Sequence, residues 1–287
     1  MSAPVPRPSF PRRQVGDFTV TAISDGTLTA GLDLLSNIDV DEATGIMHRA
    51  GVNAPSDVNI NCYVICGNGR TVLVDTGAGG IRSWGGLLRP SLSQAGIDAR
   101  DIDTVLLTHA HPDHIGGLLD SDGHPVFPQA EVLIHERERA FWLDDDMYER
   151  ASERARVNFR IARRTFDVYH AHLRTIEAGD VLPGIVSVPL PGHTPGHTGY
   201  RVESRGERLL IWGDLVHFAP IQVARPDVSI AFDHDPSQAA STRAATLADV
   251  ASDNLLIAGM HLADTGFARI ARTNAAASGA YVLIGAD

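Results

Sequence analysis

The stretch Thr108-His109-Ala110-His111-Pro112-Asp113-His114-Ile115-Gly116-Gly117 places three histidines and one aspartate within six residues. It follows the apolar run 104–107, which predicts a buried strand. The end of this strand therefore carries four side chains of the kinds that bind metal ions. Because the spacing is His-x-His-x-Asp-His on an extended turn, we expect the first two histidines to face one ion and Asp113 and His114 to face a second.

Three further candidate ligands follow three later apolar runs. His193 comes after 185–190, Asp214 after 209–212 and His261 after 255–258. A lone histidine at a strand end is usually an ordinary polar residue, but that explanation does not account for five histidines and two aspartates placed in this order after strands. The repeated pattern of a strand followed by a ligand predicts that four strand ends meet at the same rim of a sheet system. Imidazole and carboxylate ligands suit zinc above all, and also iron, manganese or cobalt.

The seven side chains divide into two metal sites. We assign His109, His111 and His193 to the first ion, Asp113, His114 and His261 to the second, and Asp214 to both. Asp214 can bridge because a carboxylate has two oxygens. Two ions roughly 3.5–4 Å apart lower the pKa of a shared water towards about 7, so the pattern predicts a bridging hydroxide as the nucleophile. No Gly-x-Ser-x-Gly motif competes with this interpretation.

This ligand set resembles that of the metallo-β-lactamase superfamily, and the similarity extends from about residue 17 to 284. It includes an early strand and an Asp-Thr-Gly turn at 72–77. The resemblance implies a four-layer αβ/βα sandwich with two metals at one edge of two packed sheets. The order of strands and helices by itself predicts two mixed sheets with helices outside, an α/β (α+β) fold. Segments 139–142, 191–198 and 211–214 are most similar to methyl parathion hydrolase and its lactonase relatives.

The resemblance implies a metal-dependent hydrolase, most simply a lactonase or arylesterase. Acyl-homoserine lactones, whose hydrolysis would quench quorum sensing, and aromatic lactones are the expected substrates, and organophosphate triesters come second. Lactonases of this superfamily commonly carry a tyrosine three residues after the bridging aspartate, where this chain has His217. His217 is either a catalytic hydrogen-bond donor or general acid, together with Asp113 and Asp214, or part of the pocket wall. Trp142 and Phe218 are the expected apolar walls, with core packing as the alternative for each.

Other chemistries use similar ligands. A glyoxalase II-like thioester hydrolase shares all seven, but only Arg269 and Arg272 follow His261 to hold glutathione. A non-catalytic metal-binding module would be expected to lack a ligand, and none is missing. Diiron redox relatives typically include glutamate, and true β-lactamases generally lack the bridging aspartate. We expect Asp75 either to orient a metal-bound imidazole or to act only as a turn residue. His197 is expected to be a non-ligand.

The composition limits the partners. The chain has 287 residues, of which 44% are hydrophobic, so it can bury a large core. Its formal charge is −11, from 35 acidic and 24 basic residues without a basic stripe, which argues against nucleic acid or anionic membranes as partners. We therefore expect a small-molecule substrate. No apolar run is long enough to span a membrane, and no leader peptide is visible, which favours a cytoplasmic location. Cys62 and Cys66 lie about 13 Å apart along one predicted strand, too far for a disulfide.

The chain is expected to form one domain over 15–287, preceded by an arm over 1–14 that is rich in proline and arginine. The arm either wraps the partner subunit of a homodimer, the expected assembly, or forms a free tail. A hairpin is predicted from 58–66 and 70–75 around Gly67-Asn68-Gly69. The charged segment 136–167 is predicted to be a helical insertion over the metals, interrupted near 144–146, and 236–252 is predicted to be a helix.

Overall fold

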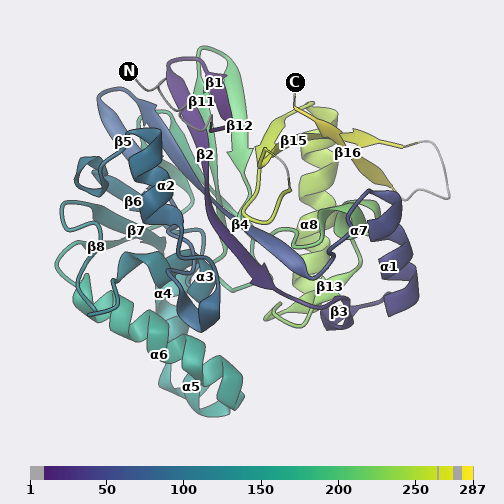
Figure 1. Cartoon of the computed structure of the whole chain (residues 1–287), viewed down its shortest axis with the longest axis horizontal. Coiled ribbons are helices and arrows are strands. Elements are labelled where there is room, and N and C mark those ends of the chain that lie inside the picture. The colour runs from purple at the N-terminus through teal and green to yellow at the C-terminus, as the bar shows by residue number, and fades with distance from the viewer. Residues whose placement is uncertain (1–9, 264, 274–279, 287) are drawn as a thin grey trace, which may run out of the picture.

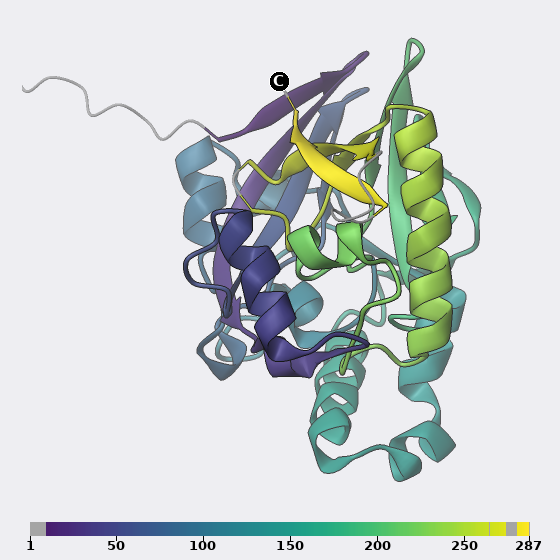
Figure 2. The ribbon, with the colours of Figure 1, turned by 90° about the vertical axis from the view of Figure 1, so that its right-hand side faces the viewer.

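A computed structural model describes residues 10–263, 265–273 and 280–286. Within these residues, two seven-stranded sheets pack against each other, and helices cover their outer faces (Figures 1 and 2). A short antiparallel pair, β3 (Leu35–Ser36) with β13 (Ser229–Ile230), joins the two halves of the chain. The predicted arrangement of two mixed sheets between helices is therefore confirmed.

The first sheet has the order β1-β2-β4-β5-β6-β7-β8. Its strands are β1 (Arg12–Val15), β2 (Phe18–Thr29), β4 (Asp57–Gly67), β5 (Arg70–Val74), β6 (Thr104–Leu106), β7 (Glu131–His135) and β8 (Leu173–Ile176). The predicted hairpin is confirmed, because β4 and β5 pair antiparallel around the turn at 67–70. From β5 to β8 the strands run parallel, so the carboxyl ends of β5 and β6 lie at the same edge.

The second sheet has the order β16-β15-β14-β12-β11-β10-β9. Its strands are β9 (Gly179–Leu182), β10 (Ile185–Pro189), β11 (Thr198–Ser204), β12 (Glu207–Ile211), β14 (Leu256–Ala258), β15 (Phe267–Arg272) and β16 (Tyr281–Gly285). β10 and β12 are both antiparallel to β11, and β12 is parallel to β14. The carboxyl ends of β10, β12 and β14 therefore meet at one edge.

Eight α-helices occur in the described residues: α1 (Val40–Arg49), α2 (Leu88–Ala95), α3 (Pro112–Ile115), α4 (Glu136–Leu143), α5 (Asp145–Arg150), α6 (Glu153–Val168), α7 (Ala219–Ala224) and α8 (Pro236–Ser252). Short 3-10 turns occupy Leu32–Leu34, Ile81–Ser83, Ala99–Asp101 and Gly116–Leu118. α8 has the predicted bounds, and Asp235 caps it by accepting a hydrogen bond from the Gln238 amide.

The predicted insertion over 136–167 forms α4, α5 and α6, which extend from the end of β7 (Figure 1). The chain breaks where two polar side chains cap new helices. Asp144 accepts a hydrogen bond from the Met147 amide and Ser152 accepts one from the Ala155 amide. The interruption predicted near 144–146 therefore has a local cause, because a capping side chain stabilises the start of a new helix.

The central strands are buried on both faces, which explains why their sequences are long apolar runs. Tyr63 and Val64 are neighbours on β4, yet both are completely buried. Tyr63 lies in the apolar layer between the sheets, whereas Val64 packs into the layer beneath the helices that cover the first sheet. Because strand side chains alternate between faces, a strand covered on both sides must be apolar at every position.

The N-terminal arm predicted over 1–14 is partly a strand in the structure. Arg12–Val15, which overlaps the predicted arm, pairs with β2 as a strand, and residues 1–9 lie outside the described residues. Cys62 and Cys66 are free thiols, as predicted. Among the described helices, none has the length and apolar character that crossing a bilayer requires.

Candidate metal centre

The segment after β6 carries the first four candidate ligands. The chain leaves β6 through His109 and His111, and α3 begins at Pro112. Proline suits the first helical position because its fixed φ is already helical and an amide proton there would have no partner inside the helix. Asp113 and His114 therefore lie in a helical turn rather than on the extended turn expected. This turn separates them from the two preceding histidines, as the assignment to two ions requires.

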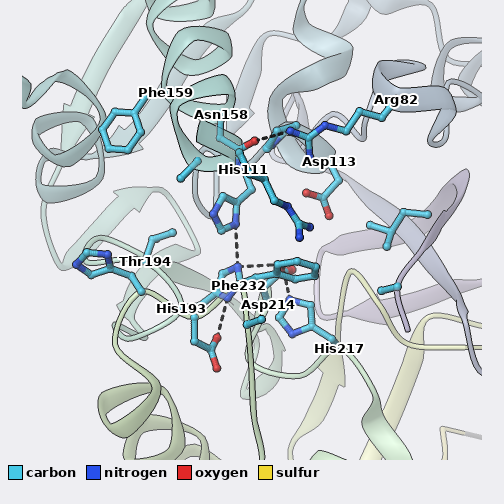
Figure 3. Close-up of a pocket in the computed structure, with 18 of the residues that line it drawn as sticks. Arg82, His111, Asp113, Asn158, Phe159, His193, Thr194, Asp214, His217 and Phe232 are labelled. Atoms are coloured by element: carbon cyan, nitrogen blue, oxygen red, sulfur yellow. Dashed lines mark hydrogen bonds and ion pairs between the residues drawn. The ribbon is translucent and has the colours of Figure 1, made fainter. Parts of the chain in front are cut away.

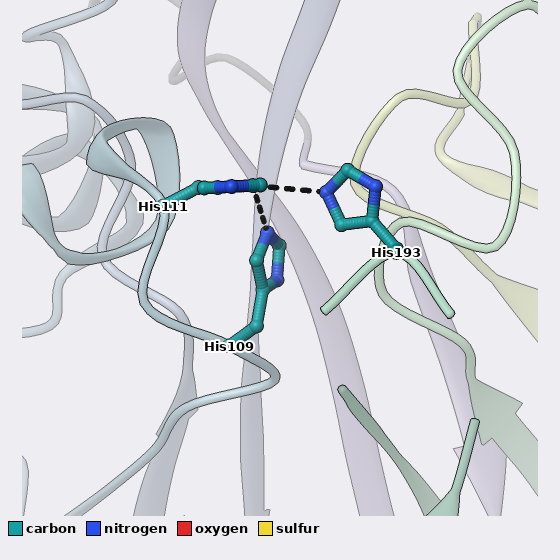
Figure 4. A group of neighbouring side chains, drawn as sticks. All are labelled: His109, His111 and His193. Carbon is teal, nitrogen blue, oxygen red and sulfur yellow. Dashed lines mark hydrogen bonds between the residues drawn. The ribbon is translucent and has the colours of Figure 1, made fainter. Parts of the chain in front are cut away.

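Three imidazoles converge at the first position (Figure 4). His109 Nε2 lies 3.0 Å from His111 Nδ1, which lies 2.9 Å from His193 Nε2. Nitrogen ligands at zinc distance around a tetrahedral ion stand about 3.3 Å apart, so the observed spacing is close to that of a metal site. Burial, followed by the neighbouring imidazoles, lowers the pKa of His109 well below its ordinary value, and burial likewise lowers that of His111. Both rings are neutral and keep lone pairs available.

The second position lies beside the first. His114 Nε2 is 3.2 Å from Asp214 Oδ1 and 3.4 Å from Asp113 Oδ2, and His261 Nε2 is 3.2 Å from Asp214 Oδ2. Asp214 Oδ2 is also 3.4 Å from His193 Nε2 in the first group. The Asp214 carboxylate therefore lies between the two groups, where a bridging ligand is expected.

Two buried atoms test whether cations fit here. His114 Nε2 and Asp214 Oδ1 have no hydrogen-bond partner among the described residues. Buried polar atoms without partners are rare, and each costs about 1–3 kcal/mol. A cation between them would satisfy both. The donor set and these two atoms fit a pair of divalent cations, although the spacing does not decide which metal.

Hydrogen bonds behind the rings orient them. His114 Nδ1 donates to Asp75 Oδ2 over 2.6 Å, and Asp75 Oδ1 accepts from the Thr108 amide over 2.8 Å. His261 Nδ1 donates to the carbonyl oxygen of Asn59 over 2.7 Å. Each of these bonds places the proton on Nδ1 and leaves Nε2 free for a metal. Asp75 thus has the orienting role considered for it, and it also forms a turn with a positive φ of 56°.

Asp233 orients His193, and the sequence analysis missed it. His193 Nδ1 lies 2.9 Å from Asp233 Oδ1, and the amide of Ile230 donates to Asp233 Oδ2. Burial opposes the charge of Asp233, but the hydrogen bond from His193 holds its pKa below the ordinary value. The buried guanidinium of Arg243 lies 3.7 Å away. No sequence signal identifies Asp233, because it is 40 residues from its partner and at no metal-binding spacing.

Glu138, also missed, connects the two loops that carry the first three histidines. Its Oε1 accepts hydrogen bonds from the Ala110 amide (3.0 Å) and the Trp142 indole (2.6 Å). Its Oε2 accepts from the Thr194 hydroxyl (2.6 Å) and the Gly196 amide (3.1 Å). Burial raises the pKa of Glu138, whereas these four donors oppose the rise. The contacts fix the two loops at a constant separation.

His197 is held by the backbone on both ring nitrogens. Its Nδ1 donates to the Leu190 carbonyl over 2.7 Å, and its Nε2 accepts the Asp214 amide over 2.9 Å. Burial lowers the pKa of His197 to about 3, so the ring is neutral and can accept. Gly213 has a φ of +59°, and a Cβ atom there would stand 2.4 Å from His197 Nε2. His197 therefore positions the backbone of Asp214 and has no free nitrogen for a metal.

A cavity of about 340 Å³ opens over these ligands (Figure 3). Asp113, His193 and Asp214 line its polar end, and its apolar wall includes Phe141, Trp142, Phe159 and Phe232. Trp142 was predicted as a wall and does line the cavity, with its ring 5.5 Å from that of His111.

His217 lines the same cavity. Its Nε2 is 3.2 Å from Asp214 Oδ2, and its Nδ1 is buried without a partner among the described residues. His193, Asp214 and His217 also present ligand atoms close to one another, so the geometry admits His217 as a ligand as well as a donor.

Phe218 does not line this cavity. It is 2% exposed and packs in an apolar cluster with Leu28 and Ile221. It borders a neighbouring cavity that His217 and His261 also line. The chain turns into α7 at this point, because the amides of His217 and Phe218 both donate to Gln222 Oε1. Phe218 as a wall of the substrate pocket therefore stays a prediction, with core packing as its alternative.

Residues 55–261 match the family described as the metallo-beta-lactamase superfamily. The chain belongs to this superfamily. It is 30% identical over 161 residues to the uncharacterized protein YobT of Bacillus subtilis (strain 168), an alignment that covers 56% of this chain and 63% of YobT. It is 31% identical over 157 residues to an atrochrysone carboxyl ACP thioesterase of Passalora fulva, covering 54% of this chain and 38% of that protein. The chain thus spans less than two thirds of either relative.

Two solved structures are similar over nearly the whole chain. The hydrolase AbOPH of the beta lactamase superfamily has a TM-score of 0.89 at 28% identity, with 97% of each chain covered. AidC, a dizinc quorum-quenching lactonase in complex with a product, has a TM-score of 0.88 at 26% identity, again with 97% of each covered. Together with the superfamily, these neighbours support an enzyme, a hydrolase with a His/Asp metal centre.

Proposed function

We propose that this protein is a two-metal hydrolase of lactones and aryl esters. The observation that carries the proposal is the convergence of seven buried or half-buried ligand side chains, which Asp214 divides between two positions. Four of them, His111, Asp113, His193 and Asp214, line the cavity. The similarity to AidC, a dizinc lactonase, supports zinc and a lactone substrate. Two zinc ions bound there would supply Lewis acidity and lower the pKa of a bound water, so no serine or cysteine nucleophile is required.

The other residues around the metal position would orient the ligands, enclose the substrate and donate a hydrogen bond to it. Glu138 and Asp233 hold the histidine rings in place, so that the polar end of the cavity is already organised before a substrate enters. Phe141, Trp142 and Phe159 would cover the apolar part of the substrate and exclude water from the reacting carbonyl. His217 faces the same cavity and would donate a hydrogen bond to the substrate oxygen on which negative charge develops.

Phosphotriesters are the second substrate class we propose. Ester and phosphotriester hydrolysis both place negative charge on an oxygen at the reacting centre, so one polar floor can stabilise both transition states. The similarity to AbOPH, a hydrolase of the same superfamily, is consistent with a shared site architecture.

Thioester hydrolysis is a further candidate because one relative is named an ACP thioesterase. Glutathione thioesters fit this structure poorly. Arg269 hydrogen-bonds to the Asn254 carbonyl, and the Arg272 guanidinium stacks 5.8 Å from the Tyr281 ring. Neither arginine lines the cavity over the metal ligands, so neither is placed to hold a glutathione carboxylate there.

A hydrolysis panel on zinc-loaded protein tests the proposal. It would contain acyl-homoserine and aromatic lactones, aryl esters, dialkyl aryl phosphotriesters and a glutathione thioester, with Asp214→Ala as the matched inactive variant. We expect turnover of lactones and aryl esters, and loss of both activity and bound zinc in Asp214→Ala because the shared carboxylate is removed. The proposal fails if the loaded protein hydrolyses none of these esters, or if Asp214→Ala retains its activity.

His217→Phe separates the two roles that the geometry allows His217. If His217 is a donor, the variant retains two equivalents of zinc and its kcat for lactones falls by about 10²- to 10⁴-fold. Loss of one zinc equivalent would instead identify His217 as a ligand.

A further inference from the structure

Two arginines stand at the mouth of the cavity over the metal ligands. Arg82 follows β5 in the turn Ile81–Ser83, and Arg154 lies in the first turn of α6, yet both line the same cavity as Asp113 and Asp214. Figure 3 shows Arg82 beside Asn158 on the same side of the cavity as Asp113. These cations come from separate segments of the chain and line one cavity together with four of the proposed ligands.

Neither guanidinium has an acidic partner. Arg82 donates one hydrogen bond, over 3.1 Å, to the neutral amide oxygen of Asn158, and its guanidinium lies 5.2 Å from the Trp84 ring. Arg154 lies 4.8 Å from the Phe232 ring, and no hydrogen bond of its guanidinium occurs among the described residues. Within the same residues, no carboxylate lies within 4 Å of either group, whereas Arg163, Arg205 and Arg225 all pair with aspartates.

Among the described residues, Arg82 and Arg154 are the arginines that line the cavity over the metal ligands. The chain has a formal charge of −11, so acidic partners are abundant elsewhere on its surface. Burial, and then the positive charge of Arg154, lower the pKa of Arg82, as expected for the repulsion of two like charges that line one cavity. The negative charge of Asp113 raises the pKa of Arg82, but Asp113 is itself one of the proposed metal ligands. A negatively charged ligand would relieve this repulsion.

We propose that Arg82 and Arg154 bind a carboxylate carried by the substrate, so that the preferred substrates are lactones or esters with a free carboxylate remote from the bond that is cleaved. The inference rests on the proposed function and specifies its substrate class. The guanidinium fork matches the two oxygens of a carboxylate, and the Trp84 and Phe232 rings support the two groups from behind. The apolar side chains that line the same cavity would hold the connecting hydrocarbon chain.

A matched pair of esters tests this substrate class. Mono-4-nitrophenyl adipate carries the free carboxylate, and its methyl ester has the same chain without the charge. We would measure kcat/KM for both with zinc-loaded wild type, Arg82→Gln, Arg154→Gln and the double variant. Arg160→Gln is the control, because it removes the same charge from α6 at a position that does not line the cavity.

We expect wild type and Arg160→Gln to prefer the charged ester by roughly tenfold at low salt, and the preference to shrink as salt screens the arginines. The double variant should hydrolyse both esters equally, at the wild-type rate for the methyl ester. In a second readout, adipate should protect zinc-free wild type, but not the double variant, from thermal unfolding.

Three results would overturn the inference. The first is equal kcat/KM for the two esters with wild type, and the second is a preference that survives in the double variant. The third is an effect on product inhibition alone, which would mean that the arginines meet the carboxylate only after hydrolysis. In each case turnover of the methyl ester shows that the proposed function stands. Failure of wild type to hydrolyse either ester would overturn that function, and this substrate class with it.

Discussion

Replacing Glu138 with glutamine should loosen the metal centre without touching a ligand. The Glu138 carboxylate accepts four hydrogen bonds, and those from Ala110, Gly196 and the Trp142 indole come from groups that can only donate. In Glu138→Gln, an amide group replaces one oxygen and meets a donor. We expect the new amide group at the Oε2 position, because the groups that face Oε1, the Ala110 amide and the Trp142 indole, can only donate.

The magnitude follows from this geometry. The Gly196 amide loses its acceptor while it remains buried, which costs about 1–3 kcal/mol, and the surviving bonds lose their assistance from a charged acceptor. The relief of a buried charge offsets part of this loss. We expect a net destabilisation of about 2–4 kcal/mol, and a fall in zinc affinity of roughly 10- to 100-fold because His111 and His193 are less firmly held.

Two measurements separate stability from metal binding. Urea unfolding of chelated protein should show a lower midpoint with an unchanged slope, and competition with a chromophoric chelator should show the weaker zinc affinity. Glu136→Gln, on the same helix but exposed to solvent, is the control and should match wild type in both. Zinc affinity equal to wild type in Glu138→Gln would refute the positioning role, even if the variant were less stable.

Two other predictions concern separate parts of the molecule. In Asp233→Asn the Nδ1 of His193 loses its charged acceptor, so zinc affinity should fall by about 10-fold or more, as measured by the same chelator competition, whereas unchanged affinity would contradict the role of Asp233. Burial raises the pKa of both Cys62 and Cys66, so these thiols stay protonated at neutral pH and should react with Ellman's reagent far more slowly in the native protein than in urea. Rapid labelling of Cys62 before unfolding would show that β4 is not buried as described.

Most helices and strands could be predicted from the sequence because their signals are local. α8 has both predicted bounds, since a capping aspartate followed by Pro236 marks its start. The strands β9 and β15 were not predicted. Both carry charged residues such as Asp180, Arg269 and Arg272, so their apolar pattern is weak. They form strands because neighbouring strands pair with them.

In the site too, some features could be predicted from local sequence and others depend on tertiary structure. The seven ligand positions could be proposed from the sequence because they lie in four segments that each follow an apolar strand. The ends of these strands, from two packed sheets, converge. Phe218 borders a different cavity from Trp142, because adjacency in sequence to His217 does not determine on which side of the turn into α7 a side chain lies. The homodimer stays a prediction.

The sequence by itself determined the chemistry of the centre, since residue types and their spacing after strands are properties of the chain alone. Only the tertiary structure decided what surrounds those ligands. Glu138, Asp233, Arg82 and Arg154 reach the site from segments far away along the chain, and none of them belongs to a recognisable spacing. The physical reason is that ligands are grouped by strand geometry, which is local, whereas the groups that orient them and bind a substrate are brought together by the packing of two sheets and their helices.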